Sequence, residues 1–482
     1  MEKLSYSDYH KYNHGEFEAS VDIATLEEFS HLLQSQPKKL YSESWRRRQI
    51  QKVPSQIRWR INMQRDDQIY DPVMVSIGPY HHGKPELRRA EEFKYLCLDW
   101  RAGGDEKKKA LFYSKILKQI GEIRDSYAEV TIVEKYDDKS LALMMLLDAS
   151  MIIDFIHNFN YQGLKGKSSS FLDWQRCLGA RSGPLMVRDM MVMENQIPFQ
   201  VLKILINLLY EREEAGLFLL RFLSHKVGIE VKHAGIPGEK EDPPIHFLEA
   251  FWRVLVKKRT DTLLKPEMEC SNNIGGNRSL VLSGMSMREE MNNDTDISYM
   301  HRSVMDLKAK GIRVVPNSNC TRSPRDITFR PNGRCFSQLQ LPIQYVSDLT
   351  LVVCSNMIAF EVLPNDTSSL VVLSYAIFMK SLIQSPEDVK ELQERGVLLN
   401  RLANLEKVVE VFKEIDTFGL HDQDIFKDVK RRIEEHCSSR AKTWFAELIY
   451  TRFRTPWTAI ALFAAVILLC LTFLQTFFTI RR

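Results

Sequence analysis

The feature that most constrains this chain is an uncharged, apolar run close to its C-terminal end. Residues 457–480 are 24 positions without a charged side chain, and 13 of them are Leu, Ile, Val or Phe. At about 1.5 Å per residue, a helix over this run would extend roughly 36 Å, against a bilayer core of about 30 Å. Those 13 side chains favour insertion by about −4 to −8 kcal/mol, at roughly −0.3 to −0.6 kcal/mol each. We therefore predict one C-terminal transmembrane helix rather than a buried core helix.

The ends of this run fit a membrane anchor. Pro456 suits the first position of a helix, Trp457 suits the bilayer interface, and Gln475 is the one amide side chain inside the span. Basic residues before the run outnumber those after it: Arg440, Lys442, Arg452 and Arg454 precede it, and Arg481 and Arg482 follow it. The positive-inside rule then places the large domain in the cytoplasm. The membrane could be the plasma membrane or an endomembrane.

No apolar signal segment occurs in residues 1–34, so we expect the chain to reach the membrane through its C-terminal run. The chain has 482 residues, of which 44% are hydrophobic, and its net charge is +4. That near-neutral balance argues against a nucleic-acid-binding protein. The 8 cysteines include no C-x-x-C pair, which indicates reduced thiols and no zinc site. We predict no metal, no cofactor and no catalytic motif.

The periodicity of the soluble part predicts a mainly α fold with a small β hairpin or sheet element, an α+β class. The nearly all-apolar stretch Leu141–Phe159 predicts a buried helix. We predict four segments: a loose N-terminus over 1–22, a mostly helical domain over 23–440, a juxtamembrane helix over 441–456 and the transmembrane helix over 457–480. Asn, Ser, Gly and Met crowd residues 265–300, where we expect a flexible insertion in the domain.

Strand signals are few. The apolar stretch Val73–Ile77 before Gly78-Pro79 predicts a short strand, and Ile312–Val315 predicts another. Asn332-Gly333 lies between two alternating runs. Because Asn and Gly accept the positive φ angles of a type I′ turn, this pair predicts a β-hairpin.

A basic stretch follows the N-terminal residues. Residues 38–65 hold nine Lys or Arg and one acid, Glu43. One interpretation is a patch that binds anionic lipid, which suits a protein beside a membrane. The other, which we favour, is a solvated face balanced by acids elsewhere, because only Trp45 and Trp59 interleave the charges.

Two adjacent histidines are the strongest candidates for a chemical role. His81 and His82 could serve as a general base or hold a metal. Neighbouring residues on extended chain point to opposite faces, so two such imidazoles seldom share one ion. The alternative, which we favour, is a structured turn in which one histidine bonds the backbone.

A second polar group stands among apolar neighbours. Glu194, Asn195 and Gln196 are followed by Ile197 and Pro198, between two apolar helical runs. These side chains could form a binding site. More often such a cluster satisfies backbone groups where a helix breaks.

These two segments carry a resemblance. Val75–Gly83 (VSIGPYHHG) and Met190–Phe199 (MMVMENQIPF) resemble hallmark motifs of the plant domain-of-unknown-function 247 family. The motif residues are Gly78, Pro79, Tyr80, His81, His82, Gly83, Glu194, Asn195, Gln196, Pro198 and Phe199. Further segments fit the pattern: Asp306–Ile312, Asn356–Glu361, Asp388–Gly396 and the Pro456-Trp457 entry to the apolar run. The resemblance implies a mostly helical domain with a C-terminal membrane helix. No catalytic residues are established for the family, so none is carried over to this chain.

The resemblance also bears on function, because some grass members of that family are linked to pollen self-incompatibility. It implies a membrane-anchored plant protein that recognises an unidentified protein partner, with membrane lipid contacting residues 457–480. The alternative is an enzyme that uses His81 and His82 with a nearby carboxylate.

Overall fold

The computed structural model describes residues 48–62, 69–161, 169–227, 242–256, 302–317, 323–332, 336–363, 369–420, 425–438 and 456–480. The chain divides into two compact units, Met1–Arg48 and Gln49–Arg482, and every described helix and strand belongs to the second. The described part is mainly helical with two small sheets, which confirms the predicted α+β class. The predicted segments 1–22 and 265–300 lie outside the described residues, as do 441–455 of the predicted juxtamembrane helix. The predicted domain boundaries stay predictions.

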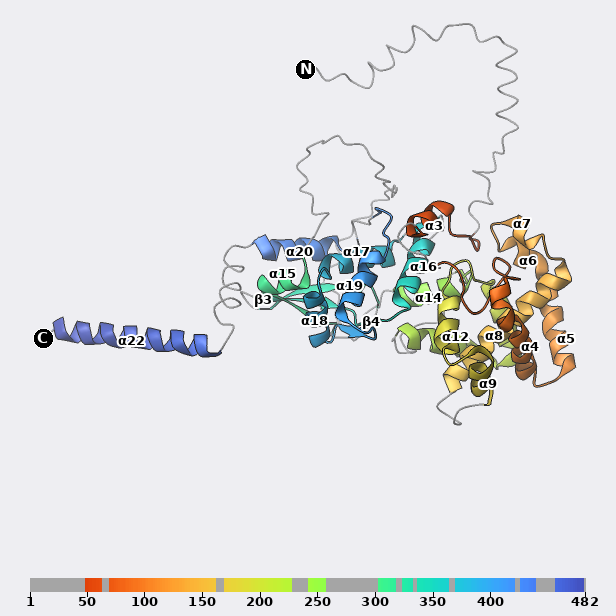
Figure 1. Cartoon of the computed structure of the whole chain (residues 1–482), viewed down its shortest axis with the longest axis horizontal. Helices are drawn as coiled ribbons and strands as arrows, with labels where there is room; N and C mark the ends of the chain where they lie inside the picture. The colour runs from red at the N-terminus through yellow and green to blue at the C-terminus, as the bar shows by residue number, and fades with distance from the viewer. Residues whose placement is uncertain are drawn as a thin grey trace, which may run out of the picture. The chain divides into compact units, whose positions relative to one another are not determined.

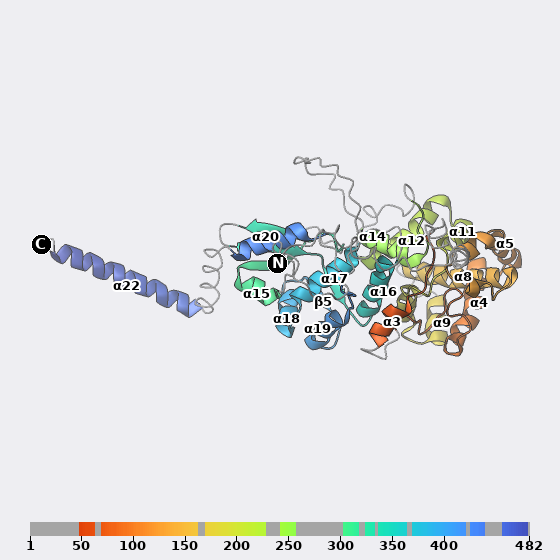
Figure 2. The same ribbon diagram turned by 90° about the horizontal axis from the view of Figure 1, so that it is seen from above.

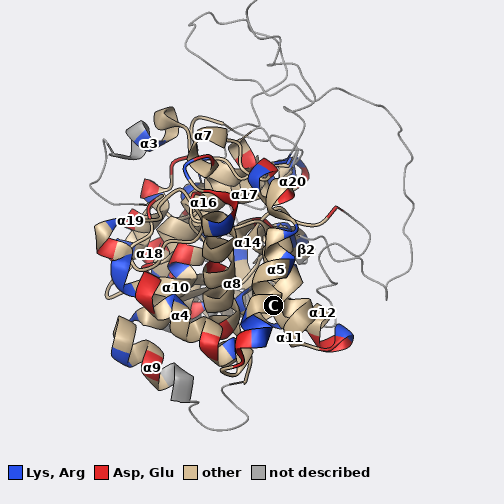
Figure 3. Cartoon of the chain, turned by 90° about the vertical axis from the view of Figure 1, so that its right-hand side faces the viewer, with Lys and Arg blue, Asp and Glu red and all other residues tan. Residues whose placement is uncertain are grey.

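Helix α8 (Asp138–Tyr161) is the centre of the first group of helices. It contains the predicted buried helix Leu141–Phe159, and most of its side chains are buried. The helices packed on it are α4 (Arg88–Ala102), α5 (Glu106–Leu117), α6 (Ile120–Asp125), α11 (Phe199–Leu209) and α12 (Arg212–Val227). On the face shown in Figure 3, basic and acidic residues are interspersed over the helices around α8.

Smaller helices complete the first group. They are α3 (Ser55–Asn62), the 3-10 turn η3 (Pro85–Leu87), α7 (Val130–Val133), α9 (Ser169–Leu178) and α10 (Ser182–Met190). Helix α4 ends at Gly103, whose φ of +70° is the left-handed conformation that commonly terminates helices. Helix α5 begins at Asp105, whose carboxylate accepts bonds from two backbone N–H groups of the first turn.

A second group of helices follows α14 (Phe247–Val256), which packs on both α12 and α16. Figures 1 and 2 both show α14 between the two groups. The second group comprises α15 (Val304–Ala309), α16 (Thr350–Val362), α17 (Val371–Leu382), α18 (Pro386–Glu394), α19 (Leu405–Glu414) and α20 (Lys427–Ser438). Capping boxes begin α15 at Ser303 and α18 at Ser385.

The predicted hairpin is confirmed, although its turn differs from the prediction. Strands β2 (Thr328–Asn332) and β3 (Phe336–Leu341) pair antiparallel, with Asn332 opposite Phe336. Three residues therefore connect the strands, whereas a type I′ turn at Asn332-Gly333 would connect them with two. The predicted strand at Ile312–Val315 is also confirmed as β1 (Ile312–Pro316), which pairs parallel with β3. A second sheet, β4 (Gln344–Val346) with β5 (Leu398–Asn400), was not predicted.

The predicted strand at Val73–Ile77 is wrong. These residues form a bend and irregular backbone and belong to no sheet. Their backbone N–H groups donate to buried side chains of Asp189 and Asn195 instead of to a neighbouring strand. Satisfying the backbone in this way removes the need for a ladder partner.

Two helices bear on a membrane assignment. Within the part of the chain whose side chains are described, α8 alone is long and apolar enough to cross a bilayer, and 78% of its apolar window is buried in the fold. Such burial is typical of a core helix. Helix α22 (Pro456–Ile480) has 25 residues, and its described side chains, within 464–479, are exposed. The prediction of one C-terminal transmembrane helix stays a prediction.

Candidate functional site

Segment 73–78 is held in place by side chains from distant parts of the chain. The carboxylate of Asp189, at the end of α10, accepts bonds from the N–H groups of Val73, Met74 and Val75 at 2.8–3.1 Å. Arg188 donates to the same carboxylate at 2.9 Å. Burial raises the pKa of Asp189, and the three N–H donors act against that rise. One acid thus fixes three consecutive residues that lead into the first motif.

The predicted polar cluster completes this attachment. Asn195 accepts from the N–H of Ile77 at 2.7 Å and donates to the carbonyls of Val75 and Asp189, each at 3.0 Å. Gln196 donates to two carbonyls of its own turn, at Met190 and Val192, each at 2.8 Å. The interpretation that these side chains satisfy backbone groups at a helix break is therefore confirmed. Pro198 is the N-cap of α11, and Phe199, its first residue, is buried.

The turn over residues 78–83, here termed the His-His turn, lies directly against the polar cluster. Gly78 has a φ of +81°, and a Cβ there would lie 2.3 Å from the carbonyl oxygen of Gln196. Only glycine allows both that conformation and that approach. Pro79 is buried, and Tyr80 donates to the carbonyl of Ile50 at 3.0 Å. Gly83 closes the turn with a φ of +84°.

His81 lies between two carboxylates. Its Nδ1 is 3.6 Å from Oδ1 of Asp71, and its Nε2 is 3.6 Å from Oε2 of Glu194. Arg58 neutralises both acids, since it donates to Glu194 at 3.1 Å and to Asp71 at 3.0 Å. Lys84 adds a second cation, 3.1 Å from Asp71.

The charges around His81 favour its neutral form. Burial lowers the pKa of His81 to about 4, and the positive charge of Lys84 lowers it further than Asp71 raises it. Burial acts to raise the pKa of Asp71, but the bonds and charges of Arg58 and Lys84 outweigh it, so that pKa is lowered. His81 is therefore a buried, uncharged imidazole at neutral pH, with 4% of its side chain exposed.

His82 belongs to a second cluster. Its Nδ1 lies 3.4 Å from Oε2 of Glu91, whose hydrogen bond raises the pKa of His82. Glu91 also accepts from Lys94 at 2.5 Å. Lys94 is fully buried, and its ammonium lies 2.6 Å from Asp148 and donates to the carbonyl of Ser76 at 2.8 Å. The other carboxylate oxygen of Asp148 accepts from the N–H of Gly78 at 2.7 Å. This ion-pair cluster thus attaches the His-His turn to α4 and α8.

The two histidines do not share a ligand site. They face different carboxylates, and within the described residues no hydrogen bond joins either imidazole to the backbone. The favoured interpretation of a structured turn is therefore confirmed, but its histidine–backbone bond is wrong. Within the described residues, no group of three or more His, Cys, Asp or Glu side chains could hold a metal ion.

Two polar residues of α16 extend the same pattern. Asn356 accepts from the N–H of Met193 at 2.8 Å and donates to the carbonyl of Ile69 at 3.0 Å. Glu361 accepts from the N–H groups of Val372 and Leu373, each at 2.9 Å. Burial raises the pKa of Glu361 to about 7. Both residues lie in Asn356–Glu361, a segment for which no role was predicted, and the available signal was a polar side chain within an apolar helix.

The described part of the basic stretch is engaged in the fold. Arg58 holds Glu194 and Asp71, and Lys52 lies 3.0 Å from Glu129. These contacts favour the interpretation of charges balanced by acids. The remaining residues of the stretch, 38–47 and 63–65, lie outside the described residues.

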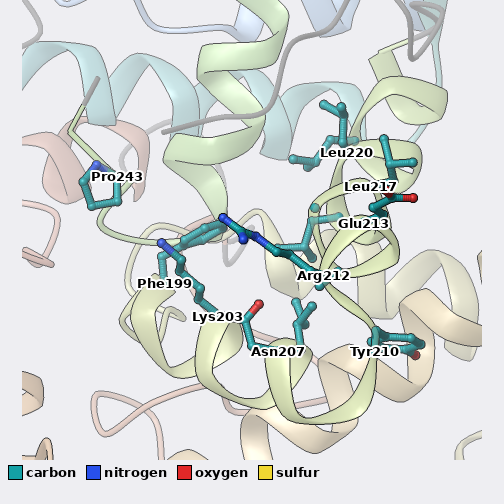
Figure 4. Close-up of a pocket in the computed structure, with 14 residues that line it drawn as sticks. Phe199, Lys203, Asn207, Tyr210, Arg212, Glu213, Leu217, Leu220 and Pro243 are labelled. Atoms are coloured by element: carbon teal, nitrogen blue, oxygen red, sulfur yellow. The ribbon is translucent and has the colours of Figure 1, made fainter. Parts of the chain in front are cut away.

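A groove lies between α11 and α12 and has a volume of about 1110 Å³. Its floor is apolar and includes Ile206 and Leu220. Figure 4 shows Lys203 and Asn207 on the α11 wall, with Arg212 extending from the start of α12. We term this feature the α11–α12 groove.

Comparison with known proteins identifies the family of this chain. Residues 50–471 match the model of the domain-of-unknown-function 247 family, described as plant protein of unknown function. The chain belongs to this family, which confirms the resemblance. It is 24% identical over 483 residues to one UPF0481 protein of Arabidopsis thaliana, with 85% of this chain and 86% of the relative covered. It is 23% identical over 424 residues to another, covering 84% of this chain and 82% of the relative. No solved structure matches the chain.

Proposed function

We propose that this chain is a plant membrane protein, anchored by α22, whose helical domain recognises a protein partner. The observation that carries the anchor is α22 itself: 25 helical residues without a charged side chain, with exposed apolar residues such as Leu469 and Phe473 at 70% and 73%. A soluble helix would bury such a surface, because leaving it in water costs about 25 cal/mol per Å².

The polar groups of α22 are compatible with lipid. The hydroxyls of Thr472, Thr476 and Thr479 each donate to the carbonyl four residues earlier, at 2.7–2.8 Å. A hydroxyl bonded within its own helix needs no water partner in the bilayer. The large domain on the cytoplasmic side is part of the proposal and rests on the flanking basic residues.

The test of the anchor is microsome extraction at alkaline pH, comparing the full chain with a chain that ends at residue 455. The full chain should remain in the membrane pellet and the shortened chain should be released. Glycosylation acceptor sites placed before α22 and after residue 482 would report the side on which the domain lies. Release of the full chain by alkali would contradict the anchor.

The structural roles of the motif residues support the recognition function. Glu194, Asn195 and Asp148 are occupied with holding backbone, and His81 is buried, so these groups favour a rigid scaffold over a reaction centre. The alternative of an enzyme that uses His81 would require substrate to reach an imidazole that is only 4% exposed. Recognition in self-incompatibility, which the family resemblance implies for some grass members, is one form that this function would take.

The α11–α12 groove is the surface that we assign to the partner. Its apolar lining is joined by the exposed cations Lys203 and Arg212 and by one exposed acid, Glu213, so two positive charges face one negative charge. That excess fits a partner segment that carries acidic groups beside apolar side chains. Proximity labelling in plant cells would compare the full chain with the charge reversal Lys203→Glu/Arg212→Glu and with the matched reversal Lys107→Glu/Lys108→Glu at the exposed start of α5. The same partner should be lost with the groove variant only. Equal labelling by all three chains would remove the groove from the proposal.

A further inference from the structure

A second hollow in the first group of helices carries three cations. It has a volume of about 500 Å³, within the range of about 300–1,000 Å³ that is usual for small-molecule sites. Its walls come from α8, α9, α10 and the end of α12, together with residues 347–349 and Arg401. We term it the cationic pocket.

The cations of the pocket are Arg181, Lys226 and Arg401, and Asp348 is the one carboxylate among its lining residues. Arg181 and Asp348 are 3.9 Å apart and each is 77% exposed. An ion pair so exposed contributes little, so Arg181 can turn toward another anion at small cost. Burial lowers the pKa of Lys226, and the like charge of Arg401 lowers it further. The pocket therefore concentrates positive charge.

Two helix N-termini add to that charge. Helix α10 begins at Ser182 and α16 begins at Thr350, and the lining residues Ser182, Gly183 and Leu349 stand at these two starts. The N–H groups of Ser182 and Thr350 are already bonded to the carbonyls of Gly179 and Ser347, so each N-terminus favours an anion chiefly through the positive end of its helix dipole.

The opposite wall is aromatic. Phe155 and Trp174 pack with their ring centroids 5.5 Å apart, and Phe159 lies under the Lys226 ammonium at 4.4 Å. The indole N–H of Trp174 donates to Asp154 at 2.8 Å, so it is already bonded within the fold. Trp174 is buried beneath the surface, so the half-buried Phe155 and Phe159 are the apolar surface that the pocket offers next to the cations.

We propose that the cationic pocket binds a small organic anion, a carboxylate or phosphate attached to an aromatic or aliphatic body. The anionic group would lie among Arg181, Lys226 and Arg401, and the apolar body against Phe155 and Phe159. This inference is independent of the membrane anchor and of the α11–α12 groove.

The test uses the full chain in a neutral maltoside detergent and isothermal titration calorimetry. The probes are phenyl phosphate, octyl phosphate, the uncharged benzyl alcohol and inorganic phosphate. Binding of phenyl or octyl phosphate at least about tenfold tighter than of the other two would support the proposal, since both parts of the ligand then contribute. Tighter octyl phosphate would indicate a lipid-like source, and tighter phenyl phosphate an aromatic metabolite. Equal binding of inorganic phosphate, or no binding of either organic phosphate, would overturn it.

Variants locate the site. Arg401→Gln changes an exposed side chain and should weaken binding of the better organic phosphate about tenfold, as expected for loss of a charge-assisted contact. Lys226→Met keeps the apolar stem on Phe159 and should have a similar effect, with unfolding curves checking that the domain stays folded. Lys203→Gln removes a cation from the other groove and should leave binding unchanged. Equal affinity of Arg401→Gln, Lys226→Met and the unaltered chain would contradict the assignment.

Discussion

Gly78 lies directly against the backbone of Gln196. The approach is so close that a Cβ at Gly78 would lie 2.3 Å from the Gln196 carbonyl oxygen. The two motifs that are most distinctive in the sequence are thus in direct contact. Replacing Gly78 by Ala should lower the free energy of unfolding by about 2–4 kcal/mol, from the left-handed conformation and the overlap together. Urea unfolding of the full chain in detergent measures this change in the free energy of unfolding.

Gly83 is the matched control for that substitution. Its φ of +84° is nearly the same, but a Cβ there would meet nothing within 4 Å. Gly83→Ala should therefore cost only the conformational part, about 1–2 kcal/mol. If both variants lose equal stability, the contact with Gln196 contributes nothing.

Asn195 tests whether the polar cluster holds the fold. Asn195→Ala leaves the N–H of Ile77 and the carbonyls of Val75 and Asp189 without this partner in a buried region. We expect a loss of about 3–4 kcal/mol, because buried unsatisfied groups are costly. The exposed Asn207→Ala should change stability by less than about 0.5 kcal/mol. A stable Asn195→Ala protein that had lost partner labelling would instead make Asn195 part of the recognition surface.

Lys94 is the buried cation that holds two acids. Lys94→Met should cost about 3–5 kcal/mol, since Asp148 would remain buried without its counter-ion and the half-buried Glu91 would keep only His82. Adding Asp148→Asn removes one of those charges while keeping an acceptor for Gly78, so the double variant should recover part of the loss. The exposed Arg88→Met is the control and should cost less than about 0.5 kcal/mol. A double variant that is less stable than Lys94→Met would contradict this account.

His81 predicts a dependence of stability on pH. Its folded pKa of about 4 lies below the ordinary value of 6.5, so the unfolded chain takes up the proton first as pH falls. Stability from His81 is complete above pH 6.5 and is lost toward pH 4, with a loss of about 2 kcal/mol between pH 7 and pH 5. The measurement is urea unfolding at both pH values for the full chain and for His81→Gln.

The comparison with His81→Gln isolates this imidazole from other titrating groups. The pKa of His157 is also lowered to about 4, and that of His82 is raised, so both affect the total but not the difference between the two proteins. The His81→Gln protein should lose about 2 kcal/mol less than the unaltered chain between pH 7 and pH 5. Parallel losses would show that His81 is not held in its neutral form.

Arginine substitutions within α22 test whether this helix is the membrane anchor. Leu468→Arg with Leu469→Arg should raise the free energy of insertion by about 5–7 kcal/mol, comparable to the about −4 to −8 kcal/mol that favours it. Much of the chain should then appear in the soluble fraction after alkaline extraction. Val130→Arg, at a position 56% exposed in α7, should leave the distribution unchanged. Retention of the double variant in the membrane would mean that α22 is not the anchor.

How far the sequence predicts this fold differs from element to element. Helix α8 was predictable because its apolar residues form one continuous run, and Asn332-Gly333 marked the hairpin. Val73–Ile77 has the composition of a strand, but Asp189 takes its N–H groups from 116 residues away, and no local pattern reveals such a partner. The sequence indicated that Glu194, Asn195 and Gln196 serve backbone groups, yet it could not say which. It also gave no sign that Lys94 is fully buried, since lysine usually lies at the surface.

The bond between Asn356 and the carbonyl of Ile69 has a consequence for synthesis of the chain, because 287 residues separate its two ends. A ribosome adds about 5–20 residues per second, so roughly 15–60 s pass before Asn356 follows Ile69 out of the exit tunnel. During that interval the first group of helices lacks the contacts that α16 provides. The nascent chain therefore presents apolar surface for tens of seconds, and chaperone occupancy should end only after residue 362 emerges.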